Sequence, residues 1–503
     1  MTRIGFGSAG RVLALAGVVA GLAGLALVVV GVRPGPARLA AGPVGYVNAD
    51  RPGIDAHNSP SVAVSPADRS TIVVADRTDT PRFSCSVSVS TNAGETWRAL
   101  PVPLPPEAPN CHQPDVAFRG DGILVLLYTA TGGRFNQPVG VWLQLYGEDL
   151  LPEGQARRVA PAEAFQAHLA VQGTGGLWVS WVQADGAADR PLGFAPGSGA
   201  VMVARWSKDQ DTFTTVRVSE PGRRVVQPTP VVAGDRLVVG ALDLGPDALD
   251  YEAQHGGQGG APDPGPWSVV AWDSTDGGAT FGPAVTVAAG LVPPARIIVN
   301  LAPAPSFAYD ADRHRLFAAW DAGVGDARDV FLARSDDGGM TWAPPVDVAP
   351  RPRGQFLPAV GVAPDGRVDV VFYDRRRDPA DLRAEVTLAS SSDGGRTFRT
   401  ATVSDAPFDS RIGFGGLQGI PVLGSQLAVL SQPGRALALW SDTGRGTADT
   451  GVQDLAVASV DEKAGGGQRP VLVVAGLLLL GLGGGLLVGV ARLRPGDRRP
   501  QQA

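Results

Sequence analysis

The chain has 503 residues, and its 43 Lys and Arg against 49 Asp and Glu give a formal net charge of -6. The charge is spread without a sizeable acidic or basic tail, which argues against a nucleic-acid partner. The length is compatible with several ordinary domains or with one large all-β unit, so it does not choose a fold class.

The first feature along the chain is an apolar run over residues 12–32, with arginines on both sides. A run of about 21 residues is long enough to cross the hydrocarbon core of a bilayer. It is expected either to remain as a transmembrane anchor or to be removed as a signal peptide, because the small residues at 37–41 offer a cleavage site. Residues 1–11 would then be a short cytoplasmic end, and residues 33–56 a linker.

The chain contains two cysteines, Cys85 and Cys111. In an oxidising compartment two such residues are expected to form a disulfide, the alternative being two buried free thiols. The sequence has no Cys/His cluster with zinc-site spacing, so neither a metal nor a cofactor is expected.

Four segments share the pattern S-x-[DN]-x-G-x-T-[WF]. In each, the side chain of Asp or Asn can bind nearby backbone N–H groups, Gly can adopt the positive φ of a tight turn, and the aromatic residue packs beneath it. We therefore assign these residues a structural role. They are Asn92, Gly94 and Trp97; Asp276, Gly278 and Phe281; Asp337, Gly339 and Trp342; and Asp393, Gly395 and Phe398.

This pattern resembles the Asp-box, or BNR, repeat of sialidases and related β-propellers. The resemblance covers essentially all of the segment between the two apolar runs. It implies four-stranded blades in which each box closes the outer hairpin, on the face opposite the ligand site.

A second repeat consists of an apolar strand, a polar turn and another apolar strand. Its copies begin near residues 57, 112, 166, 227, 300, 356 and 417. These units are typical of the two inner strands of a propeller blade. The sequence thus predicts an all-β fold, a seven-bladed β-propeller over residues 57–460. A six-bladed propeller is the alternative, because the known sialidases of this family have six blades.

An amide side chain precedes each inner hairpin. We expect these amides, together with His112 and its neighbours His57 and His168, to surround the mouth of the central channel and bind a ligand. The alternative is that they only cap strand ends. They are Asn58, Gln113, Gln166, Gln227, Asn300, Gln355 and Gln418.

The resemblance implies an enzyme with three arginines, a tyrosine nucleophile paired with a glutamate, and an aspartate as acid and base. The Arg-Ile-Pro motif of those enzymes is missing from this sequence, so whether the chain is an enzyme stays open. If it is one, the candidate catalytic residues are Tyr373, Asp374, Arg375 and Asp76.

A second apolar run over residues 470–491 is followed by arginines. It is expected to be a transmembrane helix, with residues 461–469 as a linker and 492–503 as a cytoplasmic tail, because basic flanks stay inside. The propeller would then lie on the extracytoplasmic side of the cell membrane. Its predicted function is that of a carbohydrate- or protein-binding module at the cell envelope, with an envelope glycan or protein as partner; the alternative is an exo-glycosidase of the sialidase type.

Overall fold

The computed structural model describes residues 8–32, 35–48, 55–79, 83–132, 137–173, 175–184, 199–208, 210–221, 223–245, 267–292, 304–324, 327–350, 354–380, 382–412, 423–447, 450–465 and 470–492. The chain divides into two compact units. One is Ala40–Asp461, and the other combines Met1–Leu39 with Glu462–Ala503.

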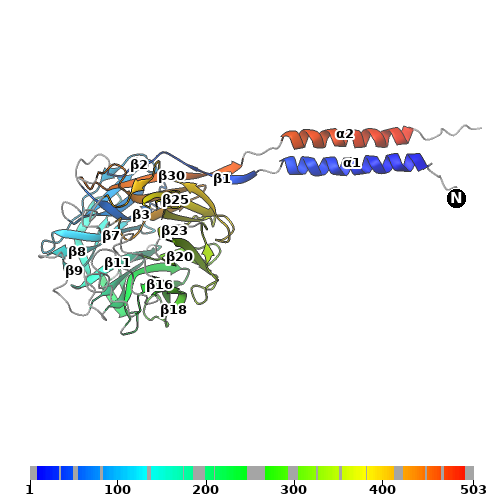
Figure 1. Cartoon of the computed structure of the whole chain (residues 1–503). Helices are drawn as coiled ribbons and strands as arrows, with labels where there is room; N and C mark the ends of the chain where they lie inside the picture. The colour runs from blue at the N-terminus through cyan, green and yellow to red at the C-terminus, as the bar shows by residue number, and fades with distance from the viewer. Residues whose placement is uncertain are drawn as a thin grey trace, which may run out of the picture. The chain divides into compact units, whose positions relative to one another are not determined.

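The larger unit is a seven-bladed β-propeller, as predicted, and the six-bladed alternative is wrong. Seven sheets follow one another along the chain. The first strand of each sheet contacts the first strands of the neighbouring sheets, and β28 of the seventh sheet contacts β3 of the first. These first strands therefore form a closed inner ring. Figure 1 shows the blades around this ring in chain order, from blue through green to orange.

Blades 1 to 6 are built from consecutive strands. Blade 1 contains β3 (His57–Val64), β4 (Ile72–Thr78), β5 (Ser84–Ser90) and β6 (Arg98–Ala99); blade 2 contains β7 (Asn110–Phe118), β8 (Leu124–Gly132), β9 (Gln137–Tyr146) and β10 (Pro152–Ala160); blade 3 contains β11 (Ala164–Gln172), β12 (Gly176–Gln183), β13 (Ala200–Ser207) and β14 (Thr212–Arg217). Blade 4 contains β15 (Val225–Ala233), β16 (Arg236–Asp243), β17 (Trp267–Ser274) and β18 (Val285–Leu291); blade 5 contains β19 (Ser306–Asp310), β20 (Arg315–Val324), β21 (Ala327–Ser335) and β22 (Val346–Asp347); blade 6 contains β23 (Gln355–Val362), β24 (Val368–Asp374), β25 (Arg383–Ser391) and β26 (Arg399–Thr402), with β27 (Phe408–Asp409) paired to β25.

Blade 7 is composed of both ends of the propeller sequence. Its first three strands are β28 (Ala428–Gln432), β29 (Arg435–Asp442) and β30 (Asp454–Gly465), and its outer strands are β1 (Gly35–Ala41) and β2 (Gly45–Tyr46). Gly45 pairs with Val457. Part of the linker expected over residues 33–56 is thus strand, because pairing with β30 gives these backbone groups hydrogen-bond partners.

The core lies between adjacent blades. Strand residues alternate in direction, so one set of side chains from each blade packs against the next blade. Val73 and Ala75 of blade 1, for example, share a buried cluster with Leu126 and Tyr128 of blade 2. Burial of this kind contributes about 25 cal/mol for each Å² of apolar surface removed from water.

The four S-x-[DN]-x-G-x-T-[WF] segments form turns between the third and fourth strands of blades 1, 4, 5 and 6. In the last copy, Ser391 Oγ donates to Asp393 Oδ1 at 2.7 Å, and the backbone N–H of Thr397 donates to the same oxygen at 3.0 Å. Gly395 has a φ of 78°, in the left-handed region that favours glycine. Asn92, Asp276 and Asp337 accept the corresponding bonds in the other copies.

The smaller unit contains two helices, α1 (Ser8–Val32) and α2 (Pro470–Arg492), which contact each other along their length. A Cβ atom on Gly17 would lie 3.1 Å from the carbonyl oxygen of Gly483, so the two backbones approach closely at glycines. Within the described residues, no helix qualifies by length and apolarity as a candidate membrane span. The transmembrane helices expected from the sequence are therefore not supported by the structure.

Candidate functional site

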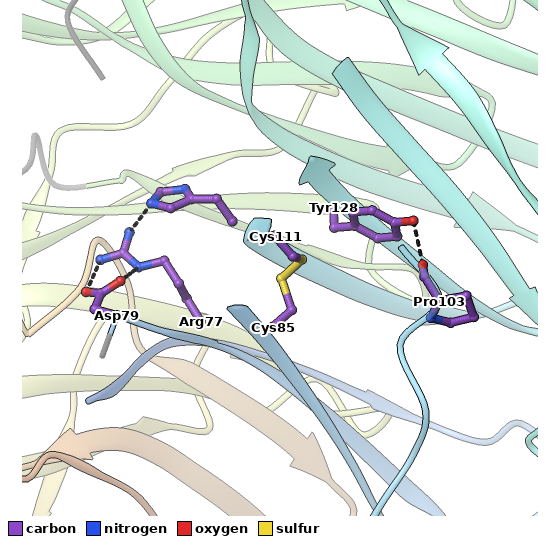
Figure 2. The surroundings of a disulfide bond; sticks show 7 residues. Arg77, Asp79, Cys85, Pro103, Cys111 and Tyr128 are labelled. Atoms are coloured by element: carbon purple, nitrogen blue, oxygen red, sulfur yellow. Dashed lines mark hydrogen bonds and ion pairs between the residues drawn. A yellow bond between two sulfur atoms is a disulfide. The ribbon is translucent and has the colours of Figure 1, made fainter. Parts of the chain in front are cut away.

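The upper face of the propeller is defined here as the face at which the first strand of each blade begins and the second ends. Arg77, near the end of β4, is the centre of a buried polar network on this face between blades 1 and 2 (Figure 2). Its Nε atom lies 2.6 Å from Asp79 Oδ1, and its Nη2 atom donates to Asp79 Oδ2 at 2.9 Å. Asn58 donates to the same carboxylate at 2.9 Å. The charge of Arg77 is thus balanced inside the fold, where Arg77 is only 2% exposed.

His112, on β7 of blade 2, contacts the remaining terminal nitrogen of this guanidinium group, Nη1. Its Nε2 atom lies 3.0 Å from Arg77 Nη1. Because a guanidinium group only donates, Nε2 must accept, and the ring proton is on Nδ1. Burial and, to a lesser degree, the charge of Arg77 lower the pKa of His112 well below its usual range. His112 is therefore a neutral imidazole with a defined tautomer, and the ring of Phe83 lies edge-on to it at 5.6 Å.

The Cys85–Cys111 disulfide joins blades 1 and 2 directly beside this network, which confirms the predicted pairing. Cys85 of β5 is the ladder partner of Arg77, and Cys111 immediately precedes His112 on β7. Figure 2 shows the disulfide between the Arg77 network and Tyr128, whose hydroxyl donates to the Pro103 carbonyl at 2.8 Å. The covalent link thus holds together the two strands that supply the network.

The other side of blade 1 carries a second buried pair. His57 Nδ1 lies 2.5 Å from Asp76 Oδ2, with both side chains almost fully buried. The backbone carbonyl of His57 accepts from Ser441 Oγ at 2.6 Å and from Gln453 Nε2 at 3.1 Å, and both donors belong to blade 7. These hydrogen bonds join the first and last blades.

The four candidate catalytic residues all make contacts within the fold. Tyr373 is fully buried, and its hydroxyl bonds the backbone of Ser441. Burial raises the pKa of Tyr373 far above its usual range, which opposes formation of a nucleophilic phenolate. Asp374 pairs with Arg376 at 2.5 Å, and Asp76 pairs with His57 as described above. The predicted catalytic assignment is therefore not supported by the geometry.

Buried arginines on the upper face are engaged within the fold. Arg375 donates to Ser410 Oγ at 2.9 Å and lies over the ring of Phe356. Arg328 of blade 5 donates to Asp321 at 2.9 Å and to backbone carbonyls. Together with Arg77, these groups are occupied by protein partners and do not present an arginine triad for a ligand carboxylate.

The predicted amide ring is an arc over blades 2 to 4. Gln113, Gln166 and Gln227 occupy equivalent positions at a β-bulge in the first strand, with φ of 48°, 54° and 55°. The backbone N–H of Gln227 donates to Gln166 Oε1 at 2.9 Å, so neighbouring blades are linked at this level.

The equivalent bulge positions in blades 1 and 6 are Ser59 and Leu357, with φ of 52° at each. Asn58 therefore precedes the bulge and bonds Asp79, and Gln355 turns away to donate to the Ala349 carbonyl at 2.8 Å. Asn300 and Gln418 lie outside the described residues.

Sequence reasoning missed Asp115, which joins the first strands of blades 1 to 3. Its carboxylate accepts from Ser61 Oγ at 2.5 Å and from the N–H of Leu169 at 2.9 Å, and His168 Nδ1 lies 3.5 Å away. Burial alone would raise the pKa of Asp115, but the bonds from His168, Ser61 and Leu169 outweigh it and lower the pKa. Asp115 is thus a carboxylate on the inner ring. The sequence contains one signal for Asp115: it lies two residues after the bulge residue Gln113, just as Ser61 lies two residues after Ser59 and His168 two residues after Gln166.

Among the residues that the structure describes, no group of three or more His, Cys, Asp or Glu side chains could hold a metal ion. The first strands of blades 2 and 3 instead carry neutral donors and acceptors: the imidazole of His112 and the amides of Gln113 and Gln166. Such groups can bind hydroxyl-bearing ligands, and they include no activated nucleophile or positioned acid.

Comparison with known proteins yields no matching protein family and no matching curated protein. Among solved structures, the chain is similar to a protein of unknown function from Dyadobacter fermentans DSM 18053, with 13% identity and a TM-score of 0.47 over 84% of this chain and 99% of that chain. It is also similar to an ulvan lyase, a polysaccharide lyase, with 11% identity and a TM-score of 0.49 over 83% and 95%. A Hadza microbial sialidase gives 14% identity and a TM-score of 0.44 over 77% and 73%. At these levels the likeness concerns the general propeller arrangement and carries no information about a ligand.

Proposed function

We propose that this β-propeller is a carbohydrate-binding module whose site is the channel mouth over blades 2 to 4. The observation that carries the proposal is the repeated positive φ at Gln113, Gln166 and Gln227. A non-glycine residue in this region costs on the order of 1–3 kcal/mol, and such outliers gather at ligand sites. Five of the described inner strands bear this cost at the same level, and the three neighbouring strands of blades 2 to 4 each place there an amide that can both donate to and accept from a hydroxyl group.

Binding without hydrolysis fits the described groups better than catalysis does. Hydrolysis of the sialidase type needs a tyrosine whose oxygen can reach the sugar, whereas the oxygen of Tyr373 bonds both backbone groups of Ser441. Arg375, Asp76 and Asp374 are likewise bound within the protein. These contacts favour the binding module over the exo-glycosidase alternative.

We also propose that residues 12–32 and 470–491 hold the module at the cell membrane, with the propeller outside the cytoplasm. Three observations support this location. The two apolar runs contain no charged residue, and Leu15, Leu22 and Leu478 of α1 and α2 are 64–67% exposed, which is costly in water. The Cys85–Cys111 disulfide in turn favours an oxidising compartment.

The location is tested in intact cells. The protein should stay in the membrane pellet after alkaline carbonate extraction, and added protease should degrade the propeller without cell lysis. Release by carbonate would contradict the anchoring, and protection from protease in intact cells would contradict the sidedness.

The binding function is tested with the full-length chain in detergent on a glycan array. We expect at least one glycan class to bind, and Gln166→Ala to weaken binding at least about fivefold through loss of hydrogen bonds at the mouth. The matched control is Gln172→Ala, which removes an exposed amide at the other end of the same strand and should leave binding unchanged. Binding of proteins but no glycan, or equal effects of the two variants, would overturn the proposal.

Hydrolysis is measured on the same preparation with a panel of fluorogenic glycosides that includes sialosides. No turnover is expected. Turnover that disappears in Tyr373→Phe while the variant remains folded would establish the enzyme alternative instead.

A further inference from the structure

A short segment of blade 7 contacts a blade that is not its neighbour. Residues 423–427 precede β28, and the carbonyl oxygen of Ser425 accepts from the N–H of Ala304 at 3.3 Å. Ala304 precedes β19 of blade 5, so this bond skips blade 6. We infer that residues 423–427, which we call the strap, are a fixed cover that closes the upper end of the central channel over blade 6 and keeps ligands out of that part.

The position of this bond follows from the ring of blades. The seven first strands form a closed ring, and a straight line between two members that are not neighbours runs inside the ring. The bond between Ser425 and Ala304 therefore lies on the channel side of the first strand of blade 6, at the face where the first strands begin. Leu357, the bulge residue of that strand, is 1% exposed. An apolar side chain is expected under a cover that excludes water, whereas blades 2 to 4 have an amide at this position.

The strap is also bound to blade 1. The N–H of Ser425 donates to Ser59 Oγ at 3.0 Å, and Gln426 Nε2 donates to the carbonyl of Pro60 at 3.1 Å. Ser425 is fully buried, and blades 1 and 5 thus provide partners for both of its backbone groups. The strap consequently joins blades 7, 1 and 5, and opening it would leave these buried groups without partners.

Gly424 allows the strap to approach blade 1 this closely. Its φ is 96°, and a Cβ atom on it would lie 2.7 Å from the backbone nitrogen of Ser59. Any side chain at residue 424 would therefore push the strap away from blade 1. Gly434, in the turn between β28 and β29, has a φ of 70° and open space around it, so alanine there causes backbone strain without a collision.

The contact between blades 5 and 7 is tested by disulfide trapping in the full-length chain in detergent. In Ala304→Cys/Ser425→Cys a new disulfide should form in air, because a backbone hydrogen bond brings the two residues within the range that a disulfide spans. The control Ala304→Cys/Ser431→Cys places the second cysteine near the other end of β28 and should keep both thiols free. Peptide mapping locates the bonds. A folded Ala304→Cys/Ser425→Cys protein without the new disulfide would overturn the inference.

The cover is tested by the rate at which a maleimide labels a single new cysteine. The two native cysteines are joined in a disulfide, so the new thiol is the only one. Leu357→Cys should react at least about tenfold more slowly than the partly exposed Gln166→Cys, because a buried thiol reacts only when the fold opens locally. Adding Gly424→Ala should raise the rate at Leu357→Cys at least about tenfold, whereas adding Gly434→Ala should not change it.

Near-UV circular dichroism shows whether each variant is folded. Equal labelling of Leu357→Cys and Gln166→Cys would contradict the cover, as would equal effects of the two glycine variants. If Gly424→Ala does not fold, Ser59→Ala takes its place, because it removes the acceptor of the Ser425 N–H group and should also speed the labelling of Leu357→Cys. Neither experiment uses a sugar, so failure of the proposed carbohydrate binding and failure of the strap are distinguished.

Discussion

The hydroxyl group of Tyr373 in blade 6 bonds both backbone groups of Ser441 in blade 7: it donates to the carbonyl oxygen at 3.0 Å and accepts from the N–H group at 3.0 Å. The same Ser441 donates through its Oγ to the carbonyl of His57 in blade 1. Three blades are thus joined through one serine at the place where the propeller closes. Tyr373 belongs to this closure and is not an open nucleophile.

Tyr373→Phe should therefore lower the free energy of unfolding by about 1–3 kcal/mol, because the buried N–H and C=O groups of Ser441 lose their partner. Urea unfolding of the two proteins measures the difference. Tyr309→Phe is the control, since the Tyr309 hydroxyl bonds His314 in an exposed position, and its effect should stay within about 0.5 kcal/mol. Equal effects of the two variants would contradict the role assigned to Tyr373.

The disulfide should contribute about 3 kcal/mol to stability, because it closes a segment with a sequence separation of 26 and so restricts the unfolded chain. Unfolding with and without reductant gives this value for the wild-type protein. The double variant Cys85→Ser/Cys111→Ser should be insensitive to reductant and about as stable as the reduced wild type. If reductant also destabilised the variant, the loss could not be assigned to this bond.

The box turns should tolerate an amide but not an apolar side chain. Asn92 already takes the place of the aspartate in the first copy, and its Oδ1 accepts from the N–H of Thr96 at 2.9 Å as Asp393 Oδ1 does from Thr397. Asp393→Asn should consequently unfold near the wild-type urea concentration and Asp393→Ala at a lower one. A result with Asn as harmful as Ala would show that the charge, and not the hydrogen bonds, maintains the turn.

The sign of the pH effect at this turn follows from its hydrogen bonds. Burial would raise the pKa of Asp393, but bonds from Thr397, Ser391 and Arg396 lower it below its usual range. A lowered pKa in the fold means that the stabilisation is present above the ordinary Asp value of about 3.9 and is lost as the pH falls through the folded value. The stability difference between wild type and Asp393→Ala should accordingly shrink only in strong acid.

The opposite dependence of stability on pH is expected for Asp442 in blade 7. Burial raises the pKa of Asp442, and the carboxylates of Asp454 and Asp405 add to the increase. The fold thus favours the protonated form, so stability is greatest below the ordinary Asp value and declines as the pH rises through the raised one.

Removing the exposed carboxylate of Asp405 tests this effect without disturbing the bonds that Asp442 accepts from Trp440 and Gly444. Asp405→Asn should stabilise the protein at pH 7, and its effect should diminish as the pH falls through the raised pKa of Asp442 and that carboxyl group becomes neutral. Asp461→Asn, an exposed change on β30, is the control. Destabilisation by Asp405→Asn at pH 7 would contradict the repulsion.

The seven-bladed fold could be predicted because blades 1 to 6 are local. Each of their hairpins joins neighbouring segments, so alternating apolar residues and turn residues mark them in order along the chain. The strands over residues 35–46 could not be recognised in this way, since their partner β30 lies some 400 residues away and the pairing uses only backbone groups.

The candidate site was predicted only in part. His112, Asn58, Asp76 and the cysteines were identified by residue type and position, but the amide ring assumed that every amide has the same register. In the structure, the register of each first strand depends on its bulge residue, which stands directly before a proline at Ser59, Gln113 and Leu357. Asn58 lies one residue before its bulge residue and Gln355 two residues before, so neither occupies the position of Gln113. Contacts between blades, such as those of Arg77 with His112 and of Asp115 with His168, depend on the closed ring and leave no pattern in the sequence.

The composite seventh blade also constrains the order in which the protein can be completed during synthesis. The first six sheets can each form once a contiguous stretch of chain has left the ribosome, but the seventh has to wait for β30, whose partner β2 was made at the very beginning. Until then the nascent propeller has exposed strand edges at both ends, which are sites for pairing with other chains. A transcript that stops before codon 454 would therefore yield an open, aggregation-prone arc in place of a slightly shorter propeller.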